Sequence, residues 1–152
     1  MTRKLLLVFA FALVATLPIA AQEPVVGVKD PESLFTDKDP VLNRNKQAAL
    51  HIMRELLQCN QWDRAGEWLT KRYIQHNPNV NTGRAGFIDF LTKLGRKPMN
   101  PIPKTMPADQ LPVVRGAKGD FVWLIFEHED KDPRNPANTY HYNSFDVLRI
   151  EN

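Results

Sequence analysis

The chain has 152 residues, a formal net charge of +3 and a single cysteine. This length suits one domain with a buried core, and one cysteine excludes an intrachain disulfide. No clustered basic face of the kind that nucleic-acid binders carry is visible, so we expect no nucleic-acid partner. We expect Cys59, beside Leu56 and Leu57, to be a buried small hydrophobe rather than a catalytic thiol.

Residues 1–21 have the pattern of a secretory signal peptide. Two basic residues precede a charge-free apolar stretch of 13 residues from Leu5 to Leu17, and small residues follow at Ala20 and Ala21. A membrane-spanning helix needs about 20 apolar residues. We therefore predict cleavage after Ala21 and an exported, periplasmic or secreted protein with no membrane attachment after cleavage. An uncleaved anchor is the alternative.

The next segments are predicted in chain order. Prolines, a glycine and several charges in residues 22–39 predict a flexible or loosely docked N-terminal segment. Asp39-Pro40 is a helix-start signal, and apolar residues at three- and four-residue spacing predict a helix over 41–58. Asn60 is expected to cap a second helix that ends before Pro78. A third helix is expected to open at Thr82-Gly83 and to close at Gly95.

The second half of the chain predicts strands. Five prolines within residues 98–112 exclude a helix there and favour an edge strand or a loop. The continuous apolar run 121–126 predicts a strand that is covered on both faces. Residues 129–138 predict a long hairpin-type loop, and the alternation over 140–150 puts Tyr142, Ser144, Asp146 and Leu148 on one face of a last strand. Residues 40–152 are therefore predicted to form an α+β domain, with three helices on one face of a curved, mainly antiparallel sheet.

The segment Tyr73-Ile-Gln-His-Asn-Pro78, followed by Gly83-Arg-Ala-Gly-Phe87 and Phe90, resembles the SnoaL-like family of the NTF2-like superfamily. Residues 119–122 and 145–152 resemble strands of that family, so the likeness covers about residues 42–152. The resemblance implies a cone of helices over a bent sheet, with a small-molecule pocket in the cone. It also implies a homodimer through the outer sheet face. Characterised members include polyketide cyclases, which close rings by intramolecular aldol chemistry with an aspartate as general acid/base.

The sequence departs from the family at its end. In the family a strand resembling Gly-Lys-Ile-Val-Glu-His-Trp-Asp follows the Glu-Asn at positions 151 and 152, and that strand carries the aspartate of the cyclases. We therefore expect the terminal strand to be missing, either because the chain is a truncated product or fragment or because the domain exists without it.

Two residues are the acid/base candidates. The resemblance places His76 at the cavity, where a neutral imidazole can give or take a proton; the alternative is that it fixes the turn before Pro78. Asp146 lies in the middle of a strand, and partial desolvation in a cavity should raise its pKa and make it a better base. The alternative is a surface acid paired with Arg149 or a lysine. In the cyclases the matching position carries a histidine.

The pocket is expected to be lined by aromatic side chains, for which packing in the core is the alternative, and by an asparagine that otherwise caps a turn. These residues are Trp62, Tyr73, Asn77, Phe87, Phe90, Trp123 and Tyr142. The four histidines lack metal-ligand spacing, and His128 with its acidic neighbours is typical of a solvated strand end, so neither a metal nor a cofactor is predicted.

The functional prediction is an exported SnoaL-like protein that binds a small apolar or carbonyl-bearing molecule. If it is an enzyme, aldol-type cyclisation or isomerisation by proton transfer next to a carbonyl is the expected chemistry. The alternative is a non-catalytic ligand-binding or dimerisation module.

Overall fold

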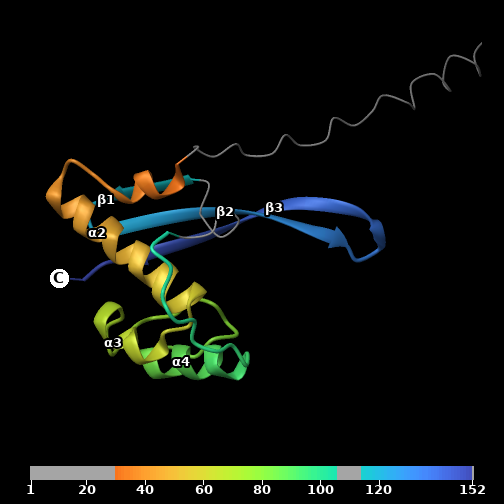
Figure 1. Cartoon of the computed structure of the whole chain (residues 1–152), viewed down its shortest axis with the longest axis horizontal. Helices are drawn as coiled ribbons and strands as arrows, with labels where there is room; N and C mark the ends of the chain where they lie inside the picture. The colour runs from red at the N-terminus through yellow and green to blue at the C-terminus, as the bar shows by residue number, and fades with distance from the viewer. Residues whose placement is uncertain (1–29, 106–113, 152) are drawn as a thin grey trace, which may run out of the picture.

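The computed structural model of the protein describes residues 30–105 and 114–151. Helices precede a three-stranded antiparallel sheet of order β1-β2-β3, an α+β arrangement as predicted. Figure 1 shows α2 running from the sheet towards the short helices α3 and α4. The predicted signal peptide and residues 22–29 lie outside the described residues, as do residues 106–112 of the proline-rich segment. The elements are η1 (Pro31–Phe35), α2 (Pro40–His51), η2 (Ile52–Gln58), η3 (Trp62–Arg64), α3 (Ala65–Trp68), α4 (Arg84–Lys93), β1 (Val114–Lys118), β2 (Phe121–Asp132) and β3 (Asn135–Arg149).

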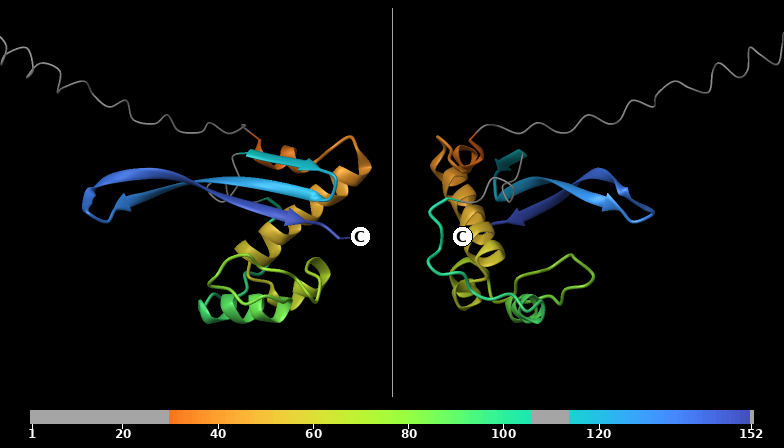
Figure 2. Two further views of the ribbon diagram at one scale, coloured as in Figure 1. Left: turned by 180° about the vertical axis from the view of Figure 1, so that it is seen from behind. Right: turned by 45° about the vertical axis from the view of Figure 1, so that its right-hand side comes forward.

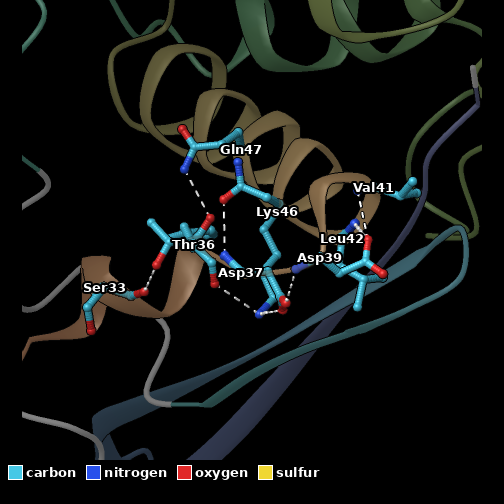
Figure 3. A network of polar contacts seen from close by, with 10 residues as sticks. Ser33, Thr36, Asp37, Asp39, Val41, Leu42, Lys46 and Gln47 are labelled. Carbon is cyan, nitrogen blue, oxygen red and sulfur yellow. Dashed lines mark hydrogen bonds and ion pairs between the residues drawn. The ribbon is translucent and has the colours of Figure 1, made fainter.

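The start of α2 follows from its sequence. Asp39 caps the helix, because its Oδ1 accepts hydrogen bonds from the backbone N–H groups of Val41 at 2.8 Å and Leu42 at 3.1 Å, while Pro40 needs no partner at the first turn. In Figure 3, Lys46 on the same helix reaches back to Asp37, with Nζ and Oδ2 2.7 Å apart. This hydrogen bond holds the pKa of Asp37 below its usual value.

The segment before α2 is docked where it is described, which corrects the prediction of a flexible segment for its second half. Residues 31–35 form a short 3-10 helix, and the side chain of Phe35 is fully buried in the core. The guanidinium of Arg115 from β1 lies over the Phe35 ring, 3.7 Å from its centroid, and burial lowers the pKa of Arg115 to about 10. Gln47 donates a hydrogen bond to the Phe35 carbonyl at 3.0 Å, so the segment is held from both sides.

The predicted first helix is confirmed in extent but changes its winding. The α-helix gives way at Ile52 to a π-helical segment that ends at Gln58. The predicted second helix is wrong in length, because η3 and α3 end at Trp68 and an irregular loop covers residues 69–82. The third helix is confirmed as α4, and the residue that follows its last turn, Gly95, has a φ of +71°.

The sheet also differs from the prediction in two ways. A long hairpin replaces the loop expected over 129–138, because β2 continues to Asp132 and β3 starts at Asn135. The apolar run of β2 is covered on one face only: Val122 and Leu124 are fully buried, whereas Phe121 and Trp123 are exposed. Both views of Figure 2 show the hairpin projecting beyond the helices.

Two apolar clusters form the core. The first packs α2 against the sheet, and the second packs η2 against α3, α4 and the loop between them. Leu57 and Leu148 contact both clusters at their margins. The members of the first are Phe35, Ala49, Leu50, Met53, Val122 and Leu124, and those of the second are Ile52, Leu56, Ala65, Leu69, Val80, Phe87 and Leu91.

Candidate functional site

The candidate site lies on the sheet face that packs against the helices, called the inner face below. Directly paired residues of an antiparallel ladder share a face, so the buried Val122 and Leu124 put their partners Leu148 and Asp146 on this inner face. Towards the hairpin turn the inner face continues with the pairs Phe126–Ser144 and His128–Tyr142. The predicted alternation of β3 is confirmed, because Ser144, Asp146 and Leu148 are partly buried while Phe145 and Val147 between them are exposed.

Asp146 is an ionisable group of the inner face whose pKa is shifted by its surroundings. Its carboxyl is partly buried, and desolvation raises its pKa above the ordinary value. Among the described residues no hydrogen bond or ion pair compensates the carboxylate. A carboxyl with a raised pKa is a better proton acceptor than an ordinary surface aspartate once it is ionised.

Tyr73, from the helical layer, lies within electrostatic range of Asp146. It lies in the loop after α3, is partly buried, and packs edge-on against Phe87 of α4 with ring centroids 5.4 Å apart. Burial raises the pKa of the Tyr73 phenol, and the charge of Asp146 adds to this rise. Two predicted site residues that are 73 positions apart in the sequence are therefore electrostatic neighbours between the sheet and the helices.

A polar group follows Asp146 along the inner face, and in it His128 joins the predicted stripe residues Ser144 and Tyr142. His128 Nε2 lies 2.7 Å from Ser144 Oγ, and the imidazole stacks on Tyr142 with ring centroids 4.8 Å apart. Tyr142 is 41% exposed, and a hydrogen bond to Asp130 raises the pKa of its phenol. The expectation that His128 is only a solvated strand end is therefore wrong: it is partly buried and held on two sides.

Two of the predicted residues are exposed on the loop of residues 69–82. His76 is exposed, so the expectation that it faces an enclosed hollow is wrong for this structure. Asn77 caps a turn, as the alternative interpretation expects: its Oδ1 accepts a hydrogen bond from the backbone N–H of Asn79 at 2.9 Å. The physical reason is the short α3, because a helix that ends at Trp68 leaves this segment as a surface loop.

The predicted aromatic lining is divided between three places. Phe87 is buried in the second core cluster, and Trp62 and Phe90 pack against that cluster. Trp123 lies on the outer face of the sheet, where its ring covers Gly116 of β1, so it shares no surface with Asp146. Of the predicted aromatic residues, Tyr142 stacks on His128 of the inner face and Tyr73 lies within electrostatic range of Asp146. Phe87 contacts the ring of Tyr73.

The larger surroundings add four observations. An open hollow of about 470 Å³ lies at the end of η2, lined by Leu57, Gln58, Asn60 and Arg96, and it contains no predicted site residue. Over residues 30–105 and 114–151, no three His, Cys, Asp or Glu side chains gather where they could hold a metal ion. Within the same ranges no helix is both long and apolar enough to cross a membrane. Cys59 is 2% exposed, which confirms the prediction of a buried hydrophobe.

Comparison of the chain with family models, curated proteins and solved structures gives no match.

The sequence contained a usable signal for Ser144 but not for its partner. Ser144 shares the period-two stripe with Asp146, and the alternation over 140–150 predicts this stripe. His128 joins it only through the register of the hairpin, which pairs His128 with Tyr142. That register depends on the irregularity beside the Pro133-Arg134 turn, where Lys131 pairs with Thr139 but Asp132 pairs with Asn135. The composition of residues 129–138 predicts only a long loop there.

Proposed function

We propose that this protein is an exported SnoaL-like protein that binds a small, carbonyl-bearing molecule on the inner face of its sheet, beside Asp146. The observation that carries the proposal is the partly buried, uncompensated Asp146 carboxyl within electrostatic range of Tyr73. Ionisable groups whose pKa is shifted by desolvation are found more often at functional sites than elsewhere. The proposal includes the NTF2-like cone, of which the helices over one face of an antiparallel sheet are the supporting part.

The chemistry that fits these groups is proton transfer at a carbon next to a carbonyl. Asp146 takes the proton, and Ser144 with His128 supplies hydrogen bonds to an oxygen of the bound molecule. Residues two apart on a strand face are separated by about 7 Å, so a molecule of a few carbon atoms reaches from Asp146 to Ser144. General acid/base catalysis of this kind typically contributes about 10²–10⁴-fold to a rate.

The test combines a ligand screen with matched variants. Thermal-shift measurements with carbonyl-bearing molecules identify binders, and a panel of aldol and isomerase substrates measures turnover. Asp146→Asn is expected to abolish turnover while the fold persists. Asp120→Asn is the matched control, because Asp120 is an exposed acid in the turn between β1 and β2. Turnover that survives in Asp146→Asn refutes the catalytic role.

His76→Ala tests the histidine that the resemblance indicates. Because His76 is exposed in this structure, the proposal expects turnover close to that of the unmodified protein in this variant. A loss as large as that of Asp146→Asn would show that the loop of residues 69–82 closes over the inner face when a ligand is bound.

A second candidate function is binding without catalysis. It is favoured by one observation: among the described residues, Asp146 forms no hydrogen bond with another acid/base group. A catalytic pair is usually held by such a bond. A ligand that stabilises the protein but is never turned over supports this candidate, and Asp146→Asn then weakens binding alone.

A further inference from the structure

The open hollow of about 470 Å³ at the end of η2 is separate from the site proposed above. Its lining residues are Leu57, Gln58, Asn60 and Arg96, and none of these four lies on a strand of the sheet. Small-molecule sites in proteins typically have volumes of about 300–1,000 Å³. The hollow therefore has the size of a ligand site, and its walls come from other elements than those around Asp146.

Hydrogen bonds fix the two walls of the hollow against each other. The end of η2 forms one wall and the segment that follows α4 forms the other; Figure 2 shows this segment running from α4 back along the long helix. The N–H of Met99 donates to the carbonyl of Cys59 at 2.9 Å, and Asn60 Nδ2 donates to the carbonyl of Lys97 at 3.1 Å. Gln61 Nε2 adds a hydrogen bond of 2.7 Å to the carbonyl of Met99. Walls held in this way need little reordering when a ligand binds, which favours affinity.

The wall at the end of η2 has two uncommon backbone features. The N–H of Cys59 donates to the carbonyl of Arg54 at 3.0 Å, which closes the last wide turn of the π-helical segment. Asn60 follows with a φ of +56°, a left-handed conformation that few residues other than glycine adopt and in which asparagine is enriched. Single π-helical turns and left-handed residues are both frequent at functional sites. These features agree with a ligand site at this end of the helix.

Asn60 also has an unused hydrogen-bond acceptor. The residue is only 8% exposed, and its Oδ1 is buried without a donor among residues 30–105 and 114–151. A buried acceptor that lacks a donor costs stability, so native proteins keep few such groups and each needs an explanation. Because Oδ1 is covered in this structure, a ligand donor reaches it only after side chains at the rim of the hollow move.

The charges around the hollow are positive. Arg96 is exposed and, within the described ranges, forms no ion pair. Residues 94–105 contain Arg96, Lys97 and Lys104 and no acid. Arg54 of η2 joins this segment, because its Nη1 donates to the carbonyl of Lys104 at 2.9 Å. The one acid of η2, Glu55, is buried and bonded to side chains of η3 and α3. The surroundings of the hollow therefore favour an anion.

We propose that this hollow is a second ligand site, which binds a hydroxylated small molecule with one oxyanion group, either a phosphate ester or a carboxylate. Arg96 holds the oxyanion by charge-assisted hydrogen bonds, for which the planar guanidinium is well suited. The side-chain amides of Gln58 and Asn60 both donate and accept, which matches hydroxyl groups. Leu57 contacts the carbon atoms of the ligand. A molecule bound here contacts none of the polar groups beside Asp146.

Four probes separate the requirement for the anion from the requirement for hydroxyl groups. Isothermal titration calorimetry of the full chain at constant ionic strength compares glucose 6-phosphate and gluconate, which carry both groups, with inorganic phosphate and glucose. We expect glucose 6-phosphate or gluconate to bind at least about tenfold more tightly than either simpler probe. The tighter of the two identifies the oxyanion as phosphate or carboxylate. The proposal is overturned if neither binds, or if glucose or inorganic phosphate binds as tightly as both.

Matched variants assign this binding to the hollow. Arg96→Gln removes the cation from an exposed position, so the protein should stay folded while the dissociation constant rises at least about tenfold. Arg44→Gln is the matched control and should bind like the unmodified protein, because Arg44 is an exposed arginine near the start of α2.

Gln58→Glu tests the lining without a change in size. It adds a negative charge to the wall of the hollow and should weaken binding at least as much as Arg96→Gln. Asp146→Asn should leave this binding unchanged, so a failure of the proposed function at Asp146 does not affect the test. Unchanged binding in both Arg96→Gln and Gln58→Glu overturns the proposal, and so does an equal loss in Arg44→Gln, because either result places the ligand elsewhere.

Discussion

Replacing Glu55 by alanine should be among the most destabilising single changes in the described part of the chain. The Glu55 carboxylate lies in η2, and the residue is only 5% exposed. Its Oε1 is 2.7 Å from His51 Nδ1, and its Oε2 is 3.0 Å from Trp68 Nε1 and 2.6 Å from Arg64 Nη1. One buried acid thus joins the α2–η2 helix to η3 and α3.

The expected cost follows from the groups that Glu55→Ala leaves behind. The indole N–H of Trp68 loses its acceptor, and an unmade hydrogen bond to a buried group costs about 1–3 kcal/mol. Removing one partner of a buried ion pair typically costs about 3–5 kcal/mol in total, and the cost is smaller here because the Arg64 side chain that is left behind is 34% exposed. Small domains have about 5–15 kcal/mol of stability, so the change uses up a large part of it. Arg64 keeps a second partner in Glu67, at 2.6 Å, which limits the loss.

Urea denaturation followed by tryptophan fluorescence measures this change in the free energy of unfolding. Glu55→Gln keeps the shape and one acceptor, and it should cost less than the alanine variant. Glu67→Gln is the matched control: its carboxylate also binds Arg64 but its side chain is 51% exposed, so the loss should stay below about 1 kcal/mol. An alanine variant that is no less stable than this control would refute the reasoning.

Four further predictions follow from other parts of the structure. Desolvation raises the pKa of Asp146, so its ionised form destabilises the folded state. This destabilisation is absent in acid and grows as the pH rises through the raised pKa. Asp146→Asn should therefore raise the melting temperature at neutral pH and leave it unchanged in acid. Phe35→Ala should cost about 3–5 kcal/mol in urea denaturation, because the ring is fully buried; a loss below about 1 kcal/mol would contradict its place in the core. Gly116→Ala should cost about 1–3 kcal/mol and shift tryptophan emission, because a Cβ there would overlap the Trp123 ring; unchanged emission and stability would contradict this packing. Cys59 should react with a thiol reagent only when the chain unfolds, because burial raises the pKa of its thiol; fast labelling of the native protein would show that it is accessible.

Local sequence signals located the regular helices well. The Asp39-Pro40 cap and the apolar spacing over 41–58 predicted the long helix, and the glycines at 83 and 95 marked the limits of α4. These features act over four residues or fewer, so they can be read from the chain alone. The winding of η2 could not be predicted, because it depends on which side chains the helix must bury on two different sides.

The predictions from sequence that are wrong concern strand pairing between residues far apart in the chain. The register of the β2–β3 hairpin, and with it the His128–Ser144 contact, is set between residues 16 positions apart. Trp123 and Val122 look alike in an apolar run, yet only contact with α2 decides which of them is buried. Asp146 was predicted from its alternation with apolar residues, and its raised pKa agrees with the expected desolvation.

The π-helical winding of η2 lets one helix serve two separate cores. Met53 packs towards the sheet, whereas Ile52 and Leu56 pack towards α3 and α4. An α-helix advances about 100° per residue, so losing a single residue from this wide turn would rotate everything after it by more than a quarter of a circle. Insertions and deletions should therefore be far less tolerated within these seven positions than at the tip of the projecting hairpin.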